Sequence, residues 1–259
     1  MVDASLTDDA GALTVTFDRQ DKLNAVDDEM LGVIATAVER LRDDDTTRVL
    51  VFQAVGRYFT AGVDLDGGLS RQMDERASKP YPDQYFRRVY RALHQLFDEI
   101  EAVEKPVILA AQGPCYGIGV ELASVCDFRF AGPAATFALP EIKIGTLPGS
   151  GGTSRITRLI GPHWSKWLTM TGQEIDAERA LAIGLLHEVV PGDGLHERVA
   201  AFARELVALP AEALGLAKLT VDMCADVDRT TQRHLERIVN TPLHGSPEFV
   251  KRTARFRRG

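Results

Sequence analysis

Residues 107–131 read VILAAQGPCYGIGVELASVCDFRFA, and this stretch decides the fold. The apolar run at 107–111 is typical of a buried strand, because it is short, uninterrupted and bounded by a turn. The glycine-rich residues 113–119 end that strand, a short helix is expected at 119–124, and another strand follows near 126–131. This order predicts parallel strands joined by a right-handed helical crossover.

The same alternation is found nearer the N-terminus. Residues 12–17 (ALTVTF) and 48–54 (RVLVFQA) are short, β-branched runs that indicate strands. Between them, apolar side chains recur every three or four residues after Asp27, which is a favoured residue type at a helix N-cap. A second amphipathic stripe at 86–103 is stopped by Lys105-Pro106. Repeated strand and helix patterns predict an α/β fold with a mainly parallel sheet.

Helical patterns dominate after about residue 152, with one short strand expected at 188–190 (EVV). Tail helices are expected near 198–209, 211–225 and 228–239. We therefore divide the chain into an α/β core, residues 1–195, which holds the active site, and a helical C-terminal region, residues 196–259. Such a tail is often an assembly surface.

Composition limits the possible partners and cofactors. The chain has 259 residues and a formal net charge of −7, which disfavours a nucleic acid as the main partner. A local exception is the basic C-terminus, formed by Lys251, Arg252, Arg255, Arg257 and Arg258. The three cysteines form no CxxC pair, and no apolar run approaches the roughly 18 residues of a membrane span. We expect no membrane association and a cytoplasmic location.

Several common catalytic and metal-binding motifs are not matched, because the spacing of their residues differs. His187-Glu188 and His196-Glu197 each begin like a zinc HExxH motif, but neither has the second histidine. Ser150 lies in PGSGG, which is not the GxSxG of a serine hydrolase. The chain has neither a GxGxxG nor a P-loop motif. The sequence therefore predicts no metal site and no bound cofactor.

Two glycine-rich turns follow predicted strands, at 56–65 (GRYFTAGVDL) and 113–122 (GPCYGIGVEL). Glycine lets backbone N–H groups approach a ligand closely, and a strand-to-helix turn presents unpaired N–H groups that suit a developing oxyanion. Glu121 lies in the first turn of the predicted helix among apolar residues. Capping of the helix would explain one such acid without any catalytic role.

A second acid favours a catalytic role for Glu121 over helix capping alone. Glu141 lies within the apolar run 137–145 (FALPEIKIG). Burial and a neighbouring carboxylate both raise the pKa of a carboxyl group, so a pair can hold one proton near neutral pH. The segment 145–155 (GTLPGSGGTSR) then opens a helix whose free N–H groups could polarise a carbonyl or bind a phosphate.

Together, the segments FTAGVDL, GPCYGIGVELA, CDFRFA and ALPEIKIGTLPGSGGTSR resemble the enoyl-CoA hydratase/isomerase (crotonase) superfamily over about residues 12–195. The resemblance implies a spiral of ββα units, with the helical tail packing into a homotrimer or a dimer of trimers. It also implies an acyl-CoA thioester substrate. Coenzyme A is then part of the substrate, and no separate cofactor is needed.

The matching motif positions imply which residues of this chain correspond to the family's site. Glu121 and Glu141 match the two carboxylates typical of true hydratases, in which one acid activates water at C3 and the other protonates C2. The backbone N–H groups of Ala61 and Ile118 match the oxyanion hole, although family members commonly have glycine where Ile118 stands. The resemblance implies substrate contacts by Arg57, Phe59, Gly62, Asp64, Leu65, Gly117, Pro140 and Gly149.

The resemblance favours an enoyl-CoA hydratase of the fatty acid β-oxidation type, which converts a 2-enoyl-CoA to a 3-hydroxyacyl-CoA. An enoyl-CoA or dienoyl-CoA isomerase is the alternative, although dienoyl isomerases carry an aspartate at the position of Gly149. A non-enzymatic alternative is an RNA-binding member of the superfamily. The segment between Asp64 and Lys105 is longer than usual and is expected to cover the acyl pocket as a mobile lid, which leaves chain-length preference open.

Overall fold

The computed structural model describes residues 3–254 and 256. Its larger sheet has the strand order β1-β2-β3-β4-β6-β9, in which all neighbours are parallel except the antiparallel pair β1 and β2. Its strands are β1 Ala4–Asp9, β2 Ala12–Phe17, β3 Val49–Ala54, β4 Val107–Ala111, β6 Phe128–Ala131 and β9 Glu188–Val189. The predicted parallel sheet is confirmed, and β1 is an edge strand that the sequence reading missed.

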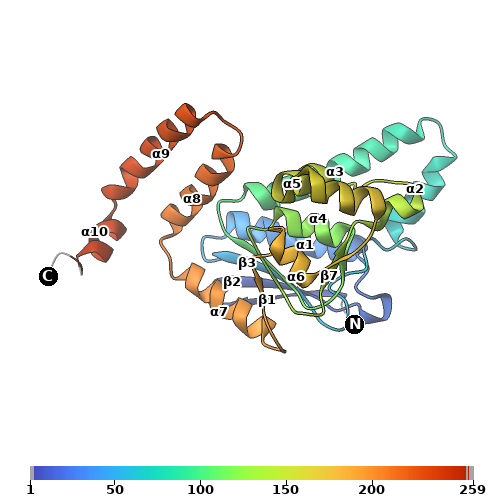
Figure 1. Cartoon of the computed structure of the whole chain (residues 1–259), viewed down its shortest axis with the longest axis horizontal. Helices are drawn as coiled ribbons and strands as arrows, with labels where there is room; N and C mark the ends of the chain where they lie inside the picture. The colour runs from blue at the N-terminus through green and yellow to red at the C-terminus, as the bar shows by residue number, and fades with distance from the viewer. Residues whose placement is uncertain (1–2, 255, 257–259) are drawn as a thin grey trace.

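Helices follow the strands in the expected alternation. The first of them, α1 (Asp28–Asp43), begins at the predicted N-cap, since the Asp27 side chain accepts a hydrogen bond from the Met30 N–H at 3.0 Å. The others in the core are α2 Gly68–Ala77, α3 Pro82–Ala102, α4 Ile118–Val125, α5 Gly152–Thr171, α6 Ala177–Ala182 and α7 Leu195–Val207. The segment expected to be a mobile lid consists largely of α2 and the long helix α3 (Figure 1).

Hydrophobic layers cover both faces of the larger sheet. On one face, the apolar side of α1 packs with the buried ends of α3, α4 and α5. On the other face, Val199, Ala203 and Leu206 of α7 pack against strand residues such as Val51 and Ile108. Because α7 belongs to this core layer, the predicted boundary at residue 195 falls inside the core rather than at its edge.

A small second sheet lies beside the larger one, with the strand order β5-β7-β8. Its strands are β5 Cys115–Tyr116, β7 Thr136–Ala138 and β8 Ile175–Asp176. Strand β5 continues the chain directly after β4, and a 3-10 helix, η2 (Pro140–Ile144), follows β7. Strand β5 is therefore followed by α4 and strand β7 by η2, so the small sheet positions the start of each helix.

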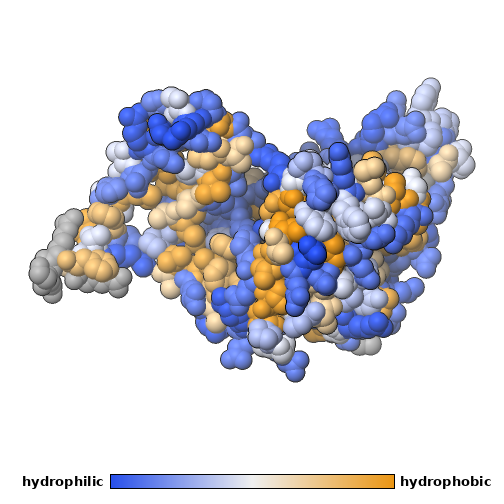
Figure 2. Space-filling view, in the orientation of Figure 1, coloured by the Kyte–Doolittle hydropathy of each residue, from blue (hydrophilic) through white to orange (hydrophobic). Residues whose placement is uncertain are grey.

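The tail leaves the core after Pro210 as α8 (Ala211–Cys224), α9 (Arg229–His244) and α10 (Pro247–Thr253), and α9 and α10 stand clear of the core in Figure 1. Apolar surface is drawn in orange on the tail and on the adjoining part of the core in Figure 2. Val221 and Ile238 are each 69% exposed in the single chain. Of the basic cluster, Arg252 pairs with Glu248, whereas 255 and 257–258 lie outside the described residues.

Within the described residues, no helix combines the length and the hydrophobicity needed to cross a membrane. Those residues also contain no group of three or more His, Cys, Asp or Glu side chains placed to hold a metal ion.

Candidate active site

The two glycine-rich turns lie side by side because they follow neighbouring parallel strands. Strands β3 and β4 pair in register, so their carboxyl ends meet at the same edge of the sheet. Beyond that edge, the N–H groups of Phe59 and Thr60 donate to the Pro114 carbonyl at 3.0 and 3.1 Å. The Tyr116 N–H donates back to the Thr60 carbonyl at 3.0 Å. These bonds fix one turn against the other.

Gly117 is required where the two turns meet. Its φ of +53° lies in the left-handed region that side chains disfavour. A Cβ there would come within 3.6 Å of the Gly62 Cα and within 2.9 Å of a Glu141 carboxylate oxygen. A larger residue would therefore displace Glu141, the second predicted acid, and would adopt a strained backbone conformation.

The oxyanion hole needs a correction at one of its two positions. The Ala61 N–H donates to the Leu23 carbonyl at 3.0 Å, so it is engaged inside the protein and is not free for a substrate. In the described part of the chain, the N–H groups of Val63 and Ile118 have no hydrogen-bond acceptor, and both residues line the same cavity. Beside Gly62 and Gly117, where the two turns meet, the free donors are therefore Val63 and Ile118, and the predicted role of Ala61 is wrong.

The start of α4 explains why Ile118 is free. The Val120 and Glu121 N–H groups both donate to the Gly117 carbonyl, at 2.9 and 3.1 Å. Ile118 is the first residue of the helix, and no preceding carbonyl of the helix can accept its N–H. Its backbone is therefore an open donor at the positive end of α4.

Glu121 is almost completely buried, with 3% of its surface exposed, and three donors hold its carboxylate. One oxygen accepts the N–H groups of Ser150 at 2.9 Å and Gly152 at 3.1 Å, and the other accepts the Ser150 hydroxyl at 3.0 Å. Burial raises the pKa of Glu121, while these hydrogen bonds and the charge of His94 offset part of that rise. The donors favour the ionised form, as a general base requires.

Glu141 has a different environment. Its Oε2 is buried, and no hydrogen-bond partner for it exists among the described residues. Burial raises the pKa of Glu141 to about 7; a backbone hydrogen bond opposes this rise, and the neighbouring Glu121 adds to it. One acid is thus surrounded by donors that favour its ionised form, and the other is not.

Both carboxylates face one cavity of about 470 Å³, which also contains the two free N–H groups. Apolar side chains from α3, η2, the loop after η2 and the two turns form most of its wall. They are Val63, Leu65, Tyr90, Leu93, Ile118, Ile144 and Leu147. A cavity of this size with few polar groups suits the acyl part of a thioester.

The predicted substrate contacts divide into two groups. Five line this cavity: Gly62, Leu65, Gly117, Pro140 and Gly149. Phe59, Asp64 and Arg57 do not line it. Arg57 is exposed above the ring of Tyr58, 5.5 Å from its centre, so its predicted substrate contact stays a prediction.

Two of these contacts are wrong because the side chains point into the protein. Phe59 is fully buried and packs against Phe17, with ring centres 5.5 Å apart. Asp64 is 7% exposed and binds the Arg19 guanidinium at 2.7 Å. Burial opposes ionisation of Asp64, but the hydrogen bond and charge of Arg19 outweigh it and lower its pKa. Asp64 therefore anchors the turn that carries Val63.

Sequence reasoning missed Ser150 and Tyr90. Ser150 was considered only as a nucleophile, yet the PGSGG loop places its hydroxyl and N–H on Glu121. Tyr90 covers Gly149, where a Cβ would come within 2.4 Å of the tyrosine ring. The aspartate that dienoyl isomerases carry at this position would clash with Tyr90 as it stands.

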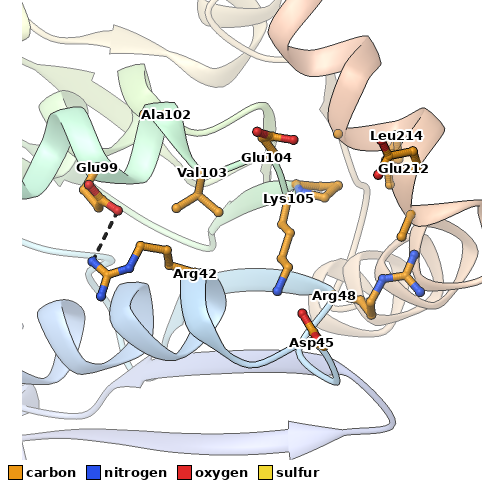
Figure 3. A pocket seen from close by; sticks show the side chains of 13 residues that line it. Arg42, Asp45, Arg48, Glu99, Ala102, Val103, Glu104, Lys105, Glu212 and Leu214 are labelled. Carbon is orange, nitrogen blue, oxygen red and sulfur yellow. Dashed lines mark hydrogen bonds and ion pairs between the residues drawn. The ribbon is translucent and has the colours of Figure 1, made fainter. Parts of the chain in front are cut away.

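A larger cavity, of about 580 Å³, lies between α1, the end of α3 and the start of α8 (Figure 3). Its cationic side chains are used by the fold itself. Arg42 pairs with Glu99 at 3.4 Å, Lys105 donates to carbonyls at the end of α1, and Arg48 donates to the carbonyl of Leu209. None of the predicted site residues lines this cavity.

Comparison with known proteins agrees with this geometry. The family model for enoyl-CoA hydratase/isomerase matches residues 7–252. The chain belongs to the enoyl-CoA hydratase/isomerase family. A crystal structure of an enoyl-CoA hydratase subunit from Geobacillus kaustophilus superposes with a TM-score of 0.88 at 30% identity, covering 99% of this chain and 95% of the other. The expected crotonase-like fold is thus confirmed.

The names of relatives within this family refer to different activities. A crotonyl-CoA hydratase of Syntrophomonas wolfei is 35% identical over 217 residues, which are 82% of this chain and 79% of that protein. A 1,2-epoxyphenylacetyl-CoA isomerase of Escherichia coli is 32% identical over 227 residues, which are 88% of this chain and 84% of that protein. Both names refer to acyl-CoA thioesters, but to different reactions.

The raised pKa of Glu141 predicts how its removal changes stability. An unfolded glutamate titrates near 4.5, whereas the folded protein holds the Glu141 proton up to about pH 7. The wild-type protein therefore loses stability as pH rises from 4.5 through 7, because the buried carboxyl group of Glu141 loses its proton and becomes charged. Glu141→Gln stays neutral, so its melting temperature relative to wild type is expected to be higher at pH 8 than at pH 5.

Thermal unfolding at both pH values measures this difference. Glu39→Gln, at an exposed site on α1, is the matched control and is expected to show little pH-dependent gain. An equal gain for both variants, or none for Glu141→Gln, would contradict the environment described for Glu141.

Proposed function

We propose that this protein is an enoyl-CoA hydratase that adds water across the 2,3 double bond of a 2-enoyl-CoA. The observation that carries the proposal is the arrangement in one cavity: two carboxylates with different environments face the two free N–H groups of Val63 and Ile118. Addition of water to an enoyl thioester needs a base for the water, an acid for C2 and donors for the enolate oxygen. The cavity supplies all of these.

In the proposed mechanism, the thioester oxygen lies between the N–H groups of Val63 and Ile118. Glu121 accepts a proton from water as the water oxygen forms a bond to C3. The negative charge that develops on the thioester oxygen is stabilised by the two N–H groups. Glu141, whose pKa is raised to about 7, delivers a proton to C2 and completes the 3-hydroxyacyl-CoA.

The isomerase alternative has support from the family, whose description covers both enoyl-CoA hydratases and isomerases. A carboxylate pair beside an oxyanion hole can also move a proton between C2 and C4. The dienoyl isomerase reaction is less well supported, because the third acid that those enzymes carry would clash with Tyr90 at the position of Gly149. An RNA-binding role is disfavoured by the net charge of −7.

Product identification with a series of 2-enoyl-CoA and 3-enoyl-CoA substrates tests this proposal. We expect the 2-enoyl-CoA absorbance to disappear with formation of 3-hydroxyacyl-CoA, and Glu121→Gln and Glu141→Gln each to lower turnover by orders of magnitude. Substrate binding should persist in both variants, because the cavity walls are unchanged. Efficient conversion of 3-enoyl-CoA without hydration of 2-enoyl-CoA would favour the isomerase instead.

The corrected oxyanion hole has its own test at Ile118. Proline is tolerated at the first residue of a helix but has no N–H, so Ile118→Pro removes the donor with little cost to α4. Loss of one oxyanion donor commonly lowers turnover about 100- to 1000-fold. Ile118→Ala keeps the N–H, so its turnover is expected to stay within about tenfold of wild type. The smaller side chain changes only the cavity wall.

Turnover rates of the two variants under saturating substrate give the comparison. Similar losses in both would show that the Ile118 side chain matters rather than its backbone N–H. Circular dichroism would confirm that α4 and the rest of the fold remain intact.

We also propose that the apolar tail assembles this chain into a trimer or a dimer of trimers. The exposed apolar side chains Val221, Ile238 and Val250 support this proposal. Light scattering is expected to give three or six times the chain mass of 28.4 kDa, and Ile238→Asp to reduce it. A monomeric wild-type protein would overturn this proposal without affecting the proposed reaction.

A further inference from the structure

Arg155 lies directly behind the loop that holds Glu121. It is on the first turn of α5, and its side chain is only 10% exposed. One guanidinium nitrogen, Nη1, donates to the Ser150 carbonyl at 2.9 Å. The N–H and hydroxyl of the same Ser150 donate to Glu121 on the other side of the loop. Arg155 is thus one residue removed from the buried carboxylate.

The local backbone leaves room for this guanidinium. Gly151 has a φ of +87°, and a Cβ at that position would come within 2.4 Å of Arg155 Nη1. The guanidinium therefore packs where any other residue would carry its side chain. Ser154 adds a second tether, since its hydroxyl donates to the Gly151 carbonyl at 2.9 Å.

The remaining donors of Arg155 connect the loop to α3. Nε donates to Glu101 at 2.9 Å, and Nη2 pairs with Asp98. Both acids are largely exposed, at 49% and 64%, so the ion pairs add little stability of their own. Their effect is geometric, because a planar guanidinium that bonds three acceptors at once is restricted in orientation. Arg155 is therefore held in place from α3.

We propose that Arg155 is a positioning residue for the general base. Its guanidinium fixes the Ser150 carbonyl and thereby aims the N–H groups of Ser150 and Gly152 at the Glu121 carboxylate. This inference rests on the proposed hydration, in which Glu121 activates water. It also connects the base to α3, the helix whose Tyr90 and Leu93 line the acyl cavity.

The proposal predicts a change in how Glu121 titrates. The groups that face its carboxylate are the donors of Ser150 and Gly152, with Glu141 from η2 and His94 from α3 acting through their charge. Without Arg155, the loop loses its orientation and the donors no longer favour the ionised carboxylate. The proton of Glu121 is then lost only at higher pH.

The test compares Arg155→Gln with Arg155→Lys and Arg158→Gln. Arg158 is a matched control on the same helix, since it pairs at 2.7 Å with Asp226 and both side chains are exposed. Using a 2-enoyl-CoA, we expect Arg155→Gln to lower kcat at least tenfold with KM changed less than threefold. The acidic limb of its kcat profile should move to higher pH. Arg155→Lys should recover part of kcat, and Arg158→Gln should match wild type.

A second measurement does not depend on turnover. Carboxyl carbon NMR of the free enzyme, with selectively labelled glutamate, follows the titration of Glu121 directly. We expect its midpoint to move to higher pH in Arg155→Gln and to stay at the wild-type value in Arg158→Gln. If the protein does not hydrate enoyl-CoA, the proposed function fails while this titration still tests the role of Arg155.

Three outcomes would overturn the proposal: an unchanged Glu121 titration in Arg155→Gln, a kcat within twofold of wild type, or an equal effect from Arg158→Gln. Should Arg155→Gln not fold, the double variant Asp98→Asn with Glu101→Gln releases the guanidinium from α3 through exposed positions. It should shift the Glu121 midpoint in the same direction by a smaller amount. No shift in that variant would also overturn the proposal.

Discussion

The buried carboxylate of Glu121 is the interaction on which the site depends. A carboxyl group with 3% exposure is stable only if hydrogen bonds replace its lost water. The loop from Ser150 to Gly152 provides them, and so the start of α5 is tied to α4. This requirement brings together two segments about thirty residues apart and forms one wall of the cavity.

The same requirement gives the two acids different environments. Glu121 lies among donors that favour its charged form, whereas an oxygen of Glu141 is buried without a partner in the described part of the chain. Burial alone would raise both pKa values, and their mutual repulsion would add to the effect. The unequal supply of hydrogen bonds is what distinguishes the two acids, and the proposed roles of base and proton donor rest on it.

Close backbone approach is the other constraint. Gly117 lies where a side chain would meet Gly62 and Glu141, and Gly149 lies where one would meet Tyr90. Glycine at these two positions therefore lets Glu141 and Tyr90 pack closely against the backbone that lines the cavity. Packing also decides which N–H groups remain free. The N–H of Ala61, in the same turn as Val63, has the Leu23 carbonyl as its acceptor.

The sequence by itself determined the alternation of strands and helices, the positions of both acids and the family, because these depend on local periodicity, turn chemistry and contiguous motifs. Tertiary structure alone decided which backbone N–H is free, since Ala61 and Val63 differ only in whether a distant carbonyl, that of Leu23, accepts their hydrogen. It also decided that Phe59 and Asp64 point inward, and that Tyr90 and Ser150 meet the site. Such contacts join residues far apart in the chain, and no local pattern specifies them.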